Sequence, residues 1–279
     1  MNDEILLIDK PAGMSSFGVV ARVRRKLSEK AGYVEVKDKD GVVREKRKKV
    51  KVGHTGTLDP FATGLLLILT GKETKRANEF LKLDKEYVAT IRLGATSTTG
   101  DIEGEIKPFV SSDQSSRFSE PAASRPVVTG ETCFDRSPLV AKSSEQACRL
   151  FPVKAVTCPS ISQVEEVVQS FIGEIEQTVP QYSAVKINGQ RAYKLAREGR
   201  QVEMPRRKIQ IYEIEILRYE WPELAIRCKV SSGTYIRTLG EDIGNKLGVG
   251  GYLTALRRTE VGEYRVDDAM TLEEYLSHP

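Results

Sequence analysis

A glycine- and threonine-rich stretch, GHTGTLDP at residues 53–60, is the strongest candidate in the sequence for a catalytic loop. It contains two glycines, two threonines and one aspartate: Gly53, Thr55, Gly56, Thr57 and Asp59. Glycine permits close backbone approach or positive φ angles, and the following Pro60 biases the Asp59 backbone toward an extended conformation. A carboxylate fixed in this way can act as a nucleophile, but Asp-Pro is also common in ordinary turns. The spacing alone leaves both interpretations open.

Arg237 is the second candidate, because its predicted position on a helix is electrostatically unfavourable. The stretch TYIRTLGEDIGNKLG, residues 234–248, predicts a helix with a buried stripe of Ile236, Leu239, Ile243 and Leu247. Arg237 lies in its first turn, where the helix dipole disfavours a cation by a few tenths to about 1 kcal/mol. We therefore expect a compensating carboxylate, either Glu241 on the same helix or one from elsewhere. An arginine beside Asp59 would hold that carboxylate ionised and oriented.

Nucleotide-phosphate loops do not fit the glycine pattern. Six residues separate Gly64 from Gly71 where a P-loop needs four, and Glu73 follows Lys72 where a hydroxyl should hold magnesium. The GVGGY stretch at 248–252 also lacks the spacing of a dinucleotide-binding fingerprint. The sequence therefore disfavours an NTPase or a dinucleotide-dependent enzyme.

Metal and disulfide chemistry are also disfavoured. The cysteines show neither C-x-x-C pairing nor a histidine partner at zinc spacing: Cys133, Cys148, Cys158 and Cys228. With His54 and His278 as the two histidines, a histidine-based metal site is nearly excluded. We expect free thiols and no metal.

The basic residues are clustered, although the net charge of the 279-residue chain is only +4. Three clusters stand out: RVRRK at 22–26, REKRKKVK at 44–51 and RRK at 206–208. Clustered lysine and arginine suit a polyanion such as nucleic acid, although any one cluster can be a solvated surface. The longest apolar run, Leu65–Leu69, is too short to span a bilayer, and the acidic N-terminus does not resemble a signal peptide. We therefore expect a cytoplasmic protein with no membrane association.

Hydrophobic periodicity predicts a mixed, largely antiparallel α+β fold, because strands outnumber helices and do not alternate regularly with them. Strands are predicted at 5–8, 65–70, 86–93, 183–187, 208–219 and 224–230. Helices are predicted from Ser15 or Ser16 to 26, at 74–81, from Ser162 as cap to Gly173 as stop, at 189–199 and at 234–248. Residues 29–51 predict an exposed hairpin or loop with DKDG as its turn, and 108–159 an irregular insertion. We expect one domain over 1–279.

Five sequence blocks together resemble the TruB family of tRNA pseudouridine synthases. They are DKPAGMSS (9–16), GHTGTLDPFATGLL (53–66), KEYVATIRLG (85–94), YSAVKINGQRAYKLAREG (182–199) and GTYIRTLGEDIG (233–244). The resemblance covers most of the chain outside 29–49 and 108–159. It implies the pseudouridine synthase fold, in which helices and loops flank a mixed sheet.

The resemblance also implies roles for individual residues. Asp59 matches the catalytic aspartate, Arg237 its partner, and Tyr87 the tyrosine that stacks on the target base and is implicated in proton abstraction. His54 matches a contact to the RNA loop around the flipped nucleotide, and residues 177–206 match a mobile segment that grips the RNA. Further RNA-binding or pocket residues follow from the matched blocks: Lys10, Pro11, Gly53, Thr55, Gly56, Thr57, Tyr182, Lys186, Arg191, Tyr193, Arg197 and Tyr235.

The implied reaction is isomerisation of uridine to pseudouridine in the T loop of tRNA, at position 55. It is redox-neutral, so no cofactor is expected. Glycosidases use two carboxylates, but uracil leaves as a stabilised anion, so one can suffice. Whether Asp59 attacks C1′ or helps remove a 2′ proton to give a glycal stays open. The expected partner is the tRNA T stem-loop, bound by a monomer without a guide RNA.

The sequence departs from the family pattern in its extension at 29–51, in its insertion and at its C-terminus. The VDDAMTLEEYLSHP ending leaves no room for the C-terminal PUA-type RNA-binding domain common in bacterial members. We hypothesise that the basic extension partly compensates. Three alternative functions remain: an RNA-binding protein or tRNA-folding chaperone, a base-excising N-glycosidase, and a guide-RNA-dependent synthase.

Overall fold

The computed structural model of this protein describes residues 3–37, 43–109, 158–187, 189–200 and 202–278. The predicted DKDG turn, most of the predicted insertion at 108–159, Cys133 and Cys148 lie outside these residues. Cys158 and Cys228 are free thiols. Within the described part of the chain, no helix is long and apolar enough to cross a membrane.

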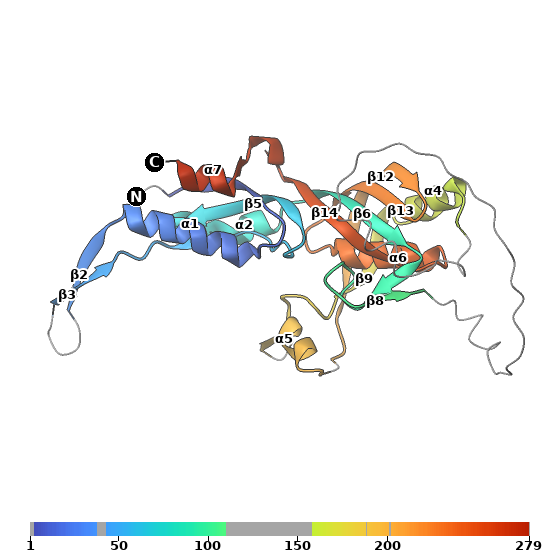
Figure 1. The fold of residues 1–279 in the computed structure, drawn as a ribbon, viewed down its shortest axis with the longest axis horizontal. Coiled ribbons are helices and arrows are strands. Elements are labelled where there is room, and N and C mark those ends of the chain that lie inside the picture. Colours follow the sequence, from blue (N-terminus) through green and yellow to red (C-terminus); the bar gives the residue numbers. More distant parts are fainter. Residues whose placement is uncertain (1–2, 38–42, 110–157, 188, 201, 279) are drawn as a thin grey trace, which may run out of the picture.

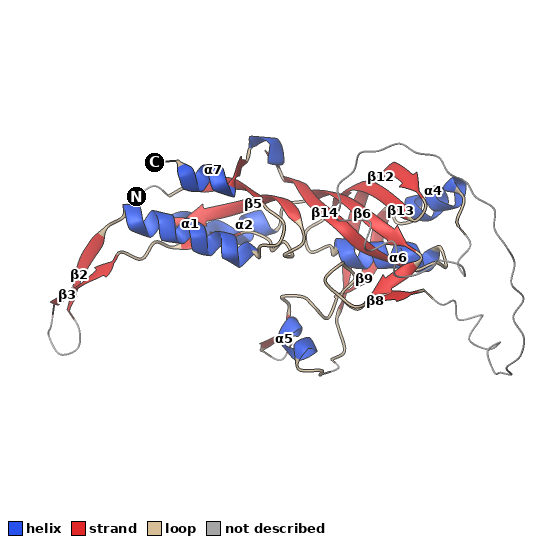
Figure 2. Cartoon of the chain, in the orientation of Figure 1, coloured by secondary structure: helices blue, strands red, loops and turns tan. Residues whose placement is uncertain are grey.

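One ten-stranded sheet runs through the molecule and confirms the predicted mixed, largely antiparallel fold (Figures 1 and 2). Its strands are β1 (Ile5–Lys10), β4 (Val52–His54), β5 (Thr63–Thr70), β6 (Lys85–Leu93), β9 (Gly173–Thr178), β12 (Arg206–Glu220), β13 (Glu223–Val230), β14 (Gly251–Val261), β15 (Tyr264–Arg265) and β16 (Met270–Thr271). The order is β16-β1-β5-β14-β6-β13-β12-β9, with β4 on β5 and β15 on β14. Only the β1–β16 and β5–β14 pairs are parallel.

Helices flank the sheet, and three small strand pairs lie apart from it (Figure 2). The α-helices are α1 (Ser16–Lys30), α2 (Ala77–Leu81), α4 (Ile161–Gln169), α5 (Ala192–Arg197), α6 (Ile236–Lys246) and α7 (Leu272–Ser277), and the 3₁₀ helices are η1 (Gly71–Arg76) and η3 (Val266–Asp268). The small pairs are β2 (Tyr33–Lys37) with β3 (Val43–Arg47), β7 (Ala95–Ser97) with β8 (Ile106–Pro108), and β10 (Lys186–Ile187) with β11 (Gln190–Arg191).

Strand β5 anchors the GHTGTLDP loop, because both of its faces are buried. Leu66 and Ile68 pack with β1 and α1, whereas Leu65, Leu67 and Leu69 pack on the opposite face against α2 and the end of β14. All five side chains are fully buried. Burial contributes about 1.5–3 kcal/mol for each such side chain. The strand confirms the prediction and begins two residues earlier, at Thr63.

Strand β14 was not predicted, although it joins the two halves of the sheet. It pairs antiparallel with β6 and, through Arg257 and Arg258, parallel with β5. The close approach needs glycine at position 64, where φ is +101° and an added Cβ would lie 2.2 Å from the Arg258 carbonyl oxygen. The second glycine-rich boundary of the motif is therefore explained by strand packing.

The second half of the sheet is covered by α4 and α6. Along β13, Leu224, Ile226, Cys228 and Val230 alternate into the core, as predicted. The predicted stripe of α6 is also buried or packed against this core. Two details of the α4 prediction are wrong. Ser160 caps the helix with Gln163, because it stands one residue before the first helical turn, and Gly173 begins β9 instead of ending the helix.

The segment between β9 and β12 projects from the sheet and carries α5 (Figure 1). The predicted helix at 189–199 is confirmed in part, as α5 over Ala192–Arg197. The strand predicted at 183–187 is shorter than expected, because only Lys186 and Ile187 pair with β11. At the other end of the molecule, α1 runs on past the predicted residue 26, and the predicted hairpin forms from β2 and β3.

Candidate active site

The loop before β5 is held from below by the first helix and the first turn of the chain. Ser16 at the start of α1 brackets Leu58: its Oγ accepts from the Leu58 backbone N at 2.8 Å and donates to the Leu58 carbonyl at 2.9 Å. The Asp59 carbonyl then accepts from the Ala62 backbone N at 3.2 Å. The aspartate therefore sits in a turn that is hydrogen-bonded on both sides.

Lys10 and Pro11 lie behind this loop. The fully buried Lys10 Nζ donates to the carbonyls of Pro11, Met14 and Pro60 at 2.8, 2.6 and 3.2 Å. Burial lowers the pKa of Lys10 to about 8, although the Asp59 carboxylate opposes that shift. Lys10 thus joins the two loops and places a buried positive charge near Asp59.

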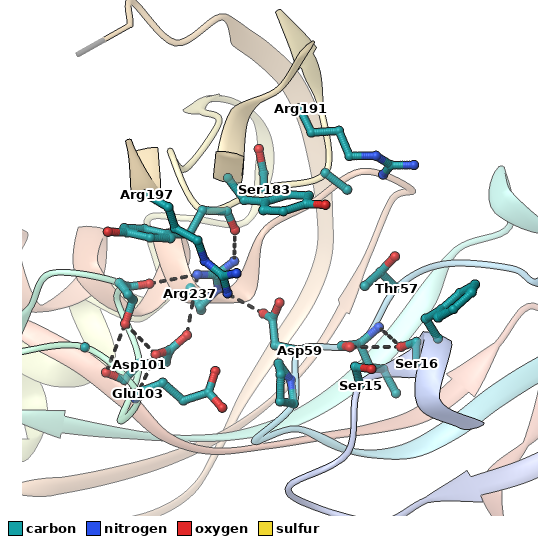
Figure 3. Close-up of a pocket in the computed structure, with 18 of the residues that line it drawn as sticks. Ser15, Ser16, Thr57, Asp59, Asp101, Glu103, Ser183, Arg191, Arg197 and Arg237 are labelled. Atoms are coloured by element: carbon teal, nitrogen blue, oxygen red, sulfur yellow. Dashed lines mark hydrogen bonds and ion pairs between the residues drawn. The ribbon is translucent and has the colours of Figure 1, made fainter. Parts of the chain in front are cut away.

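Arg237, the second residue of α6, forms ion pairs with Asp59 and a second carboxylate, Asp101 (Figure 3). Its Nε lies 3.0 Å from Asp59 Oδ2, and its Nη1 lies 3.4 Å from Asp101 Oδ2. Nη1 and Nη2 also donate to the carbonyls of Thr99 and Tyr182, both at 2.8 Å. The arginine side chain is only 6% exposed. The compensating carboxylates therefore come from other elements, and not from Glu241.

Asp101 is a site residue that sequence reasoning missed. Its side chain is 3% exposed, and its Oδ1 accepts from Thr99 Oγ1 at 2.5 Å and from the Glu103 backbone N at 2.9 Å. These bonds fix the carboxylate against Arg237. The TTGDIEG stretch at 98–104 is the available signal, because an aspartate surrounded by glycine and threonine marks a tight turn.

The electrostatics of Asp59 are balanced between burial and two cations. Burial raises the pKa of Asp59 above its ordinary value, and the Asp101 carboxylate adds to that shift. Arg237 and Lys10 oppose it. The Asp59 side chain is 33% exposed. The charged form is therefore stabilised by fixed cations while it stays accessible from the cleft.

Two clefts meet at the Asp59–Arg237 pair. The smaller, about 450 Å³, contains Tyr87, Tyr235, Gly56 and Thr57. The Tyr87 ring is 8% exposed and lies on β6 beside Cys228 of β13. This cleft combines an aromatic wall with the carboxylate, which suits a planar, neutral ligand.

The larger cleft, about 700 Å³, lies on the other side of the pair and is lined by α1, the loop and the α5 segment (Figure 3). The sequence-predicted residues that line it are His54, Thr57, Tyr182, Arg191, Tyr193 and Arg197. The Arg197 guanidinium lies over the Tyr193 ring, 5.8 Å from its centroid. Burial lowers the pKa of His54, which favours a neutral imidazole at neutral pH. Cationic and aromatic groups of this kind are typical of single-stranded RNA contacts.

The remaining predicted residues do not line either cleft. Gly53 pairs with Leu69 inside the sheet, Thr55 is fully buried in the loop, and Pro11 is exposed at the turn. Lys186 pairs in register with Arg191 in the small hairpin and is exposed. Sequence reasoning missed other cleft residues, among them Phe17, Lys85, Glu103, Arg207 and Arg258.

Comparisons with known proteins agree with this geometry. The family model described as TruB family pseudouridylate synthase (N terminal domain) matches residues 44–128 and 141–236, and that of the tRNA pseudouridylate synthase B C-terminal domain matches 237–278. The tRNA pseudouridine synthase B of Phocaeicola vulgatus is 39% identical over 272 residues, which cover 98% of this chain and 91% of that protein. The enzyme of the same name from Francisella tularensis subsp. tularensis is 43% identical over 226 residues, covering 80% of this chain and 60% of the relative.

A solved structure is also similar. A chain in the crystal structure of a Cbf5-Nop10-Gar1 complex superimposes with a TM-score of 0.58 at 25% sequence identity. The match covers 98% of this chain, which spans about half of that protein (53%). Family models over most of the sequence and a relative aligned over nearly its whole length lead to one conclusion: this chain belongs to the TruB family of pseudouridylate synthases.

Proposed function

We propose that this protein isomerises uridine to pseudouridine in the T loop of tRNA, at position 55, with Asp59 as the reacting carboxylate. The observation that carries the proposal is the Asp59–Arg237 ion pair at the meeting point of the two clefts. Relatives named tRNA pseudouridine synthase B support the tRNA substrate.

The aromatic cleft is the proposed site of the target base. The uridine must leave the stacked RNA loop, which costs a few kcal/mol. Stacking on Tyr87 would offset about 1–3 kcal/mol of that cost. Because Asp59 and Arg237 line the same cleft, the sugar of the bound nucleotide would lie beside the carboxylate.

Asp59 acts in its ionised form in this scheme. Cleavage of the N-glycosidic bond releases uracil as a resonance-stabilised anion, so a second carboxylate to protonate the leaving group is unnecessary. Arg237 binds Asp59 through Oδ2 and orients the carboxylate, while Lys10 adds positive charge behind the loop. Rejoining through C5 is redox-neutral, and the C5 proton is lost to solvent. Both attack at C1′ and removal of a 2′ proton agree with this arrangement.

The larger cleft is the proposed site of the rest of the T loop. His54 would contact the loop nucleotides around the gap that the flipped base leaves, and Arg191, Tyr193 and Arg197 would hold the RNA from the α5 side. Tyr182 connects the two regions, because its carbonyl accepts from Arg237. RNA binding by the projecting segment is thereby coupled to the position of the arginine.

We further infer that the protein acts in the cytoplasm as a monomer on free tRNA, without a guide RNA, and that the basic β2–β3 hairpin adds contacts to the RNA. The test of the whole proposal is a tRNA transcript incubated with the protein and analysed for pseudouridine by carbodiimide-dependent primer-extension stops. A new stop for position 55 supports it. Free uracil would instead identify an N-glycosidase, and tight binding without product would favour an RNA chaperone.

A further inference from the structure

Adjacent basic residues of β12 face opposite sides of the sheet. Arg206 and Lys208 form ion pairs with Glu176 and Glu174 of β9, at 3.3 and 2.8 Å. Arg207 lies between them and, because side chains alternate along a strand, points to the other face. Within the part of the chain that the structure describes, Arg207 forms no ion pair.

The inward face of β12 leads to the aromatic cleft. Arg207 is paired in register with Gln177, whose side-chain amide accepts from the Tyr235 backbone N at 2.8 Å and donates to the Tyr235 carbonyl at 3.0 Å. A Cβ added at Gly233 would lie 3.9 Å from Arg207 Nη1. Arg207 therefore stands at the mouth of the cleft that contains Tyr87.

Two further cations, both buried, line the same cleft. Lys85 Nζ donates to the carbonyls of Leu81, at 2.7 Å, and Leu83. Arg258 donates from Nε to the Leu65 carbonyl at 2.8 Å and from Nη2 to the Gly56 carbonyl at 3.2 Å. Lys85 is 6% exposed and Arg258 is 1% exposed, and neither forms an ion pair with a carboxylate among the described residues. Burying unpaired cations is costly, so an anionic ligand is expected here.

The excess positive charge is more than the target base requires. Uracil is neutral, and Asp59 is already paired with Arg237. The other charged groups of a flipped nucleotide are the phosphodiesters on either side of its ribose. An arginine at the cleft mouth can bind such a group through two hydrogen bonds.

We propose that the cleft holds a phosphodiester group that directly flanks the flipped uridine, with Arg207 as its contact residue and with Lys85 and Arg258 attracting it by their charge. The inference rests on the proposed function for the identity of the nucleotide. It assigns Arg207 a role in binding the RNA backbone, separate from the chemistry at Asp59.

Phosphate-ethylation interference tests the contact. T-arm RNA is ethylated with ethylnitrosourea at about one phosphate per molecule, and the fraction that binds the protein is separated and mapped. The test compares wild type with Arg207→Gln, and uses Arg206→Gln as a matched control, because it removes an adjacent arginine from the opposite face. All three proteins are first compared by thermal unfolding, and Arg207→Lys serves as a second variant.

We expect wild type and Arg206→Gln to exclude RNA that is ethylated at one phosphate flanking the target uridine, and Arg207→Gln to accept it. Arg207→Gln should also bind unmodified RNA about tenfold more weakly and reduce the slope of log affinity against log salt by about 0.7. Identical interference in all three proteins, or no interference at either flanking phosphate in wild type, would overturn the proposal. Because the readout is binding, absence of pseudouridine in a parallel incubation would refute the proposed function without deciding the phosphate contact.

Discussion

The guanidinium Nε of Arg237 lies 3.0 Å from Oδ2 of Asp59, and this ion pair connects the first turn of α6 to the loop before β5. The same guanidinium reaches Asp101 through Nη1. A cation at a helix N-terminus is thereby stabilised by two carboxylates from outside the helix. The arrangement fixes the direction of Asp59 and makes the geometry of the site depend on Asp101.

Replacing Asp101 with asparagine should lower the rate of pseudouridine formation by about tenfold or more, because Arg237 loses one of its charged partners. The Asp101 charge raises the pKa of Asp59, so its removal should lower that pKa and move the acidic limb of the pH–rate profile to lower pH. Single-turnover rates measured across pH 4–8 check both effects. Glu105→Gln is the control, since Glu105 is exposed and paired with Lys107. An acidic limb that moves to higher pH would contradict this electrostatic account.

Ser16→Ala should reduce both stability and turnover, because it leaves the buried backbone N and carbonyl of Leu58 without their partner. The expected loss is about 2 kcal/mol in the free energy of unfolding, measured with urea. Thr271→Ala removes the N-cap of α7 and should cost about 1 kcal/mol without affecting the rate. If Ser16→Ala lost stability but kept full turnover, the bracket around Leu58 would not position Asp59.

Glu241→Gln should stabilise the protein more at pH 8 than at pH 5. Burial, with the nearby Asp242 carboxylate, raises the pKa of Glu241 to about 7. Between pH 4.5 and 7 the folded state therefore binds more protons at this site than the unfolded state, and stability falls as the pH rises. The substitution removes this loss, with an expected gain of about 1–2 kcal/mol at pH 8. Urea unfolding at the two pH values measures it, and Glu165→Gln on the exposed face of α4 is the control. An equal gain at both pH values would show that Glu241 is not the responsible group.

Neutralising the basic end of the hairpin should weaken tRNA binding and flatten its salt dependence. The change is Lys46, Arg47, Lys48 and Lys49 to glutamine, four positions in and directly after β3. Each lost phosphate contact should reduce the slope of log affinity against log salt by about 0.9 for duplex RNA-like stems. Filter binding from 50 to 200 mM salt measures the slope. An unchanged slope would exclude the hairpin from RNA binding.

The central pair of the site could be predicted from the sequence, because each residue carries a local signal. Asp59 stands in a glycine-rich loop before a buried strand, and Arg237 occupies a helix position that needs an outside carboxylate. Asp101 carries no comparable signal, since an aspartate after Thr-Thr-Gly reads as an ordinary turn. The bracket formed by Ser16 was hidden for another reason: both serines of the motif fit a helix cap, and only the fold brings one of them to Leu58.

Most long strands were predictable from their hydrophobic pattern, and the exceptions have physical reasons. Register shifts between Leu253 and Ala255 and between Arg258 and Glu260 break the alternation of β14, so its sequence does not show a period of two. Its buried Arg258 also reads as a surface residue until the carbonyls that it binds are known. The small cleft was missed with this strand, because β14 supplies Leu256 and Arg258 to its wall.

The most direct test of the account uses tRNA transcript tritiated at uridine C5, incubated in EDTA with wild type, Asp59→Asn and Asp59→Ala. The account predicts that wild type releases tritium to water with no free uracil, and that both variants release none while they still bind the tRNA and unfold cooperatively. Release by Asp59→Asn or Asp59→Ala at the wild-type rate would contradict the central claim, since the reacting carboxylate would then lie elsewhere.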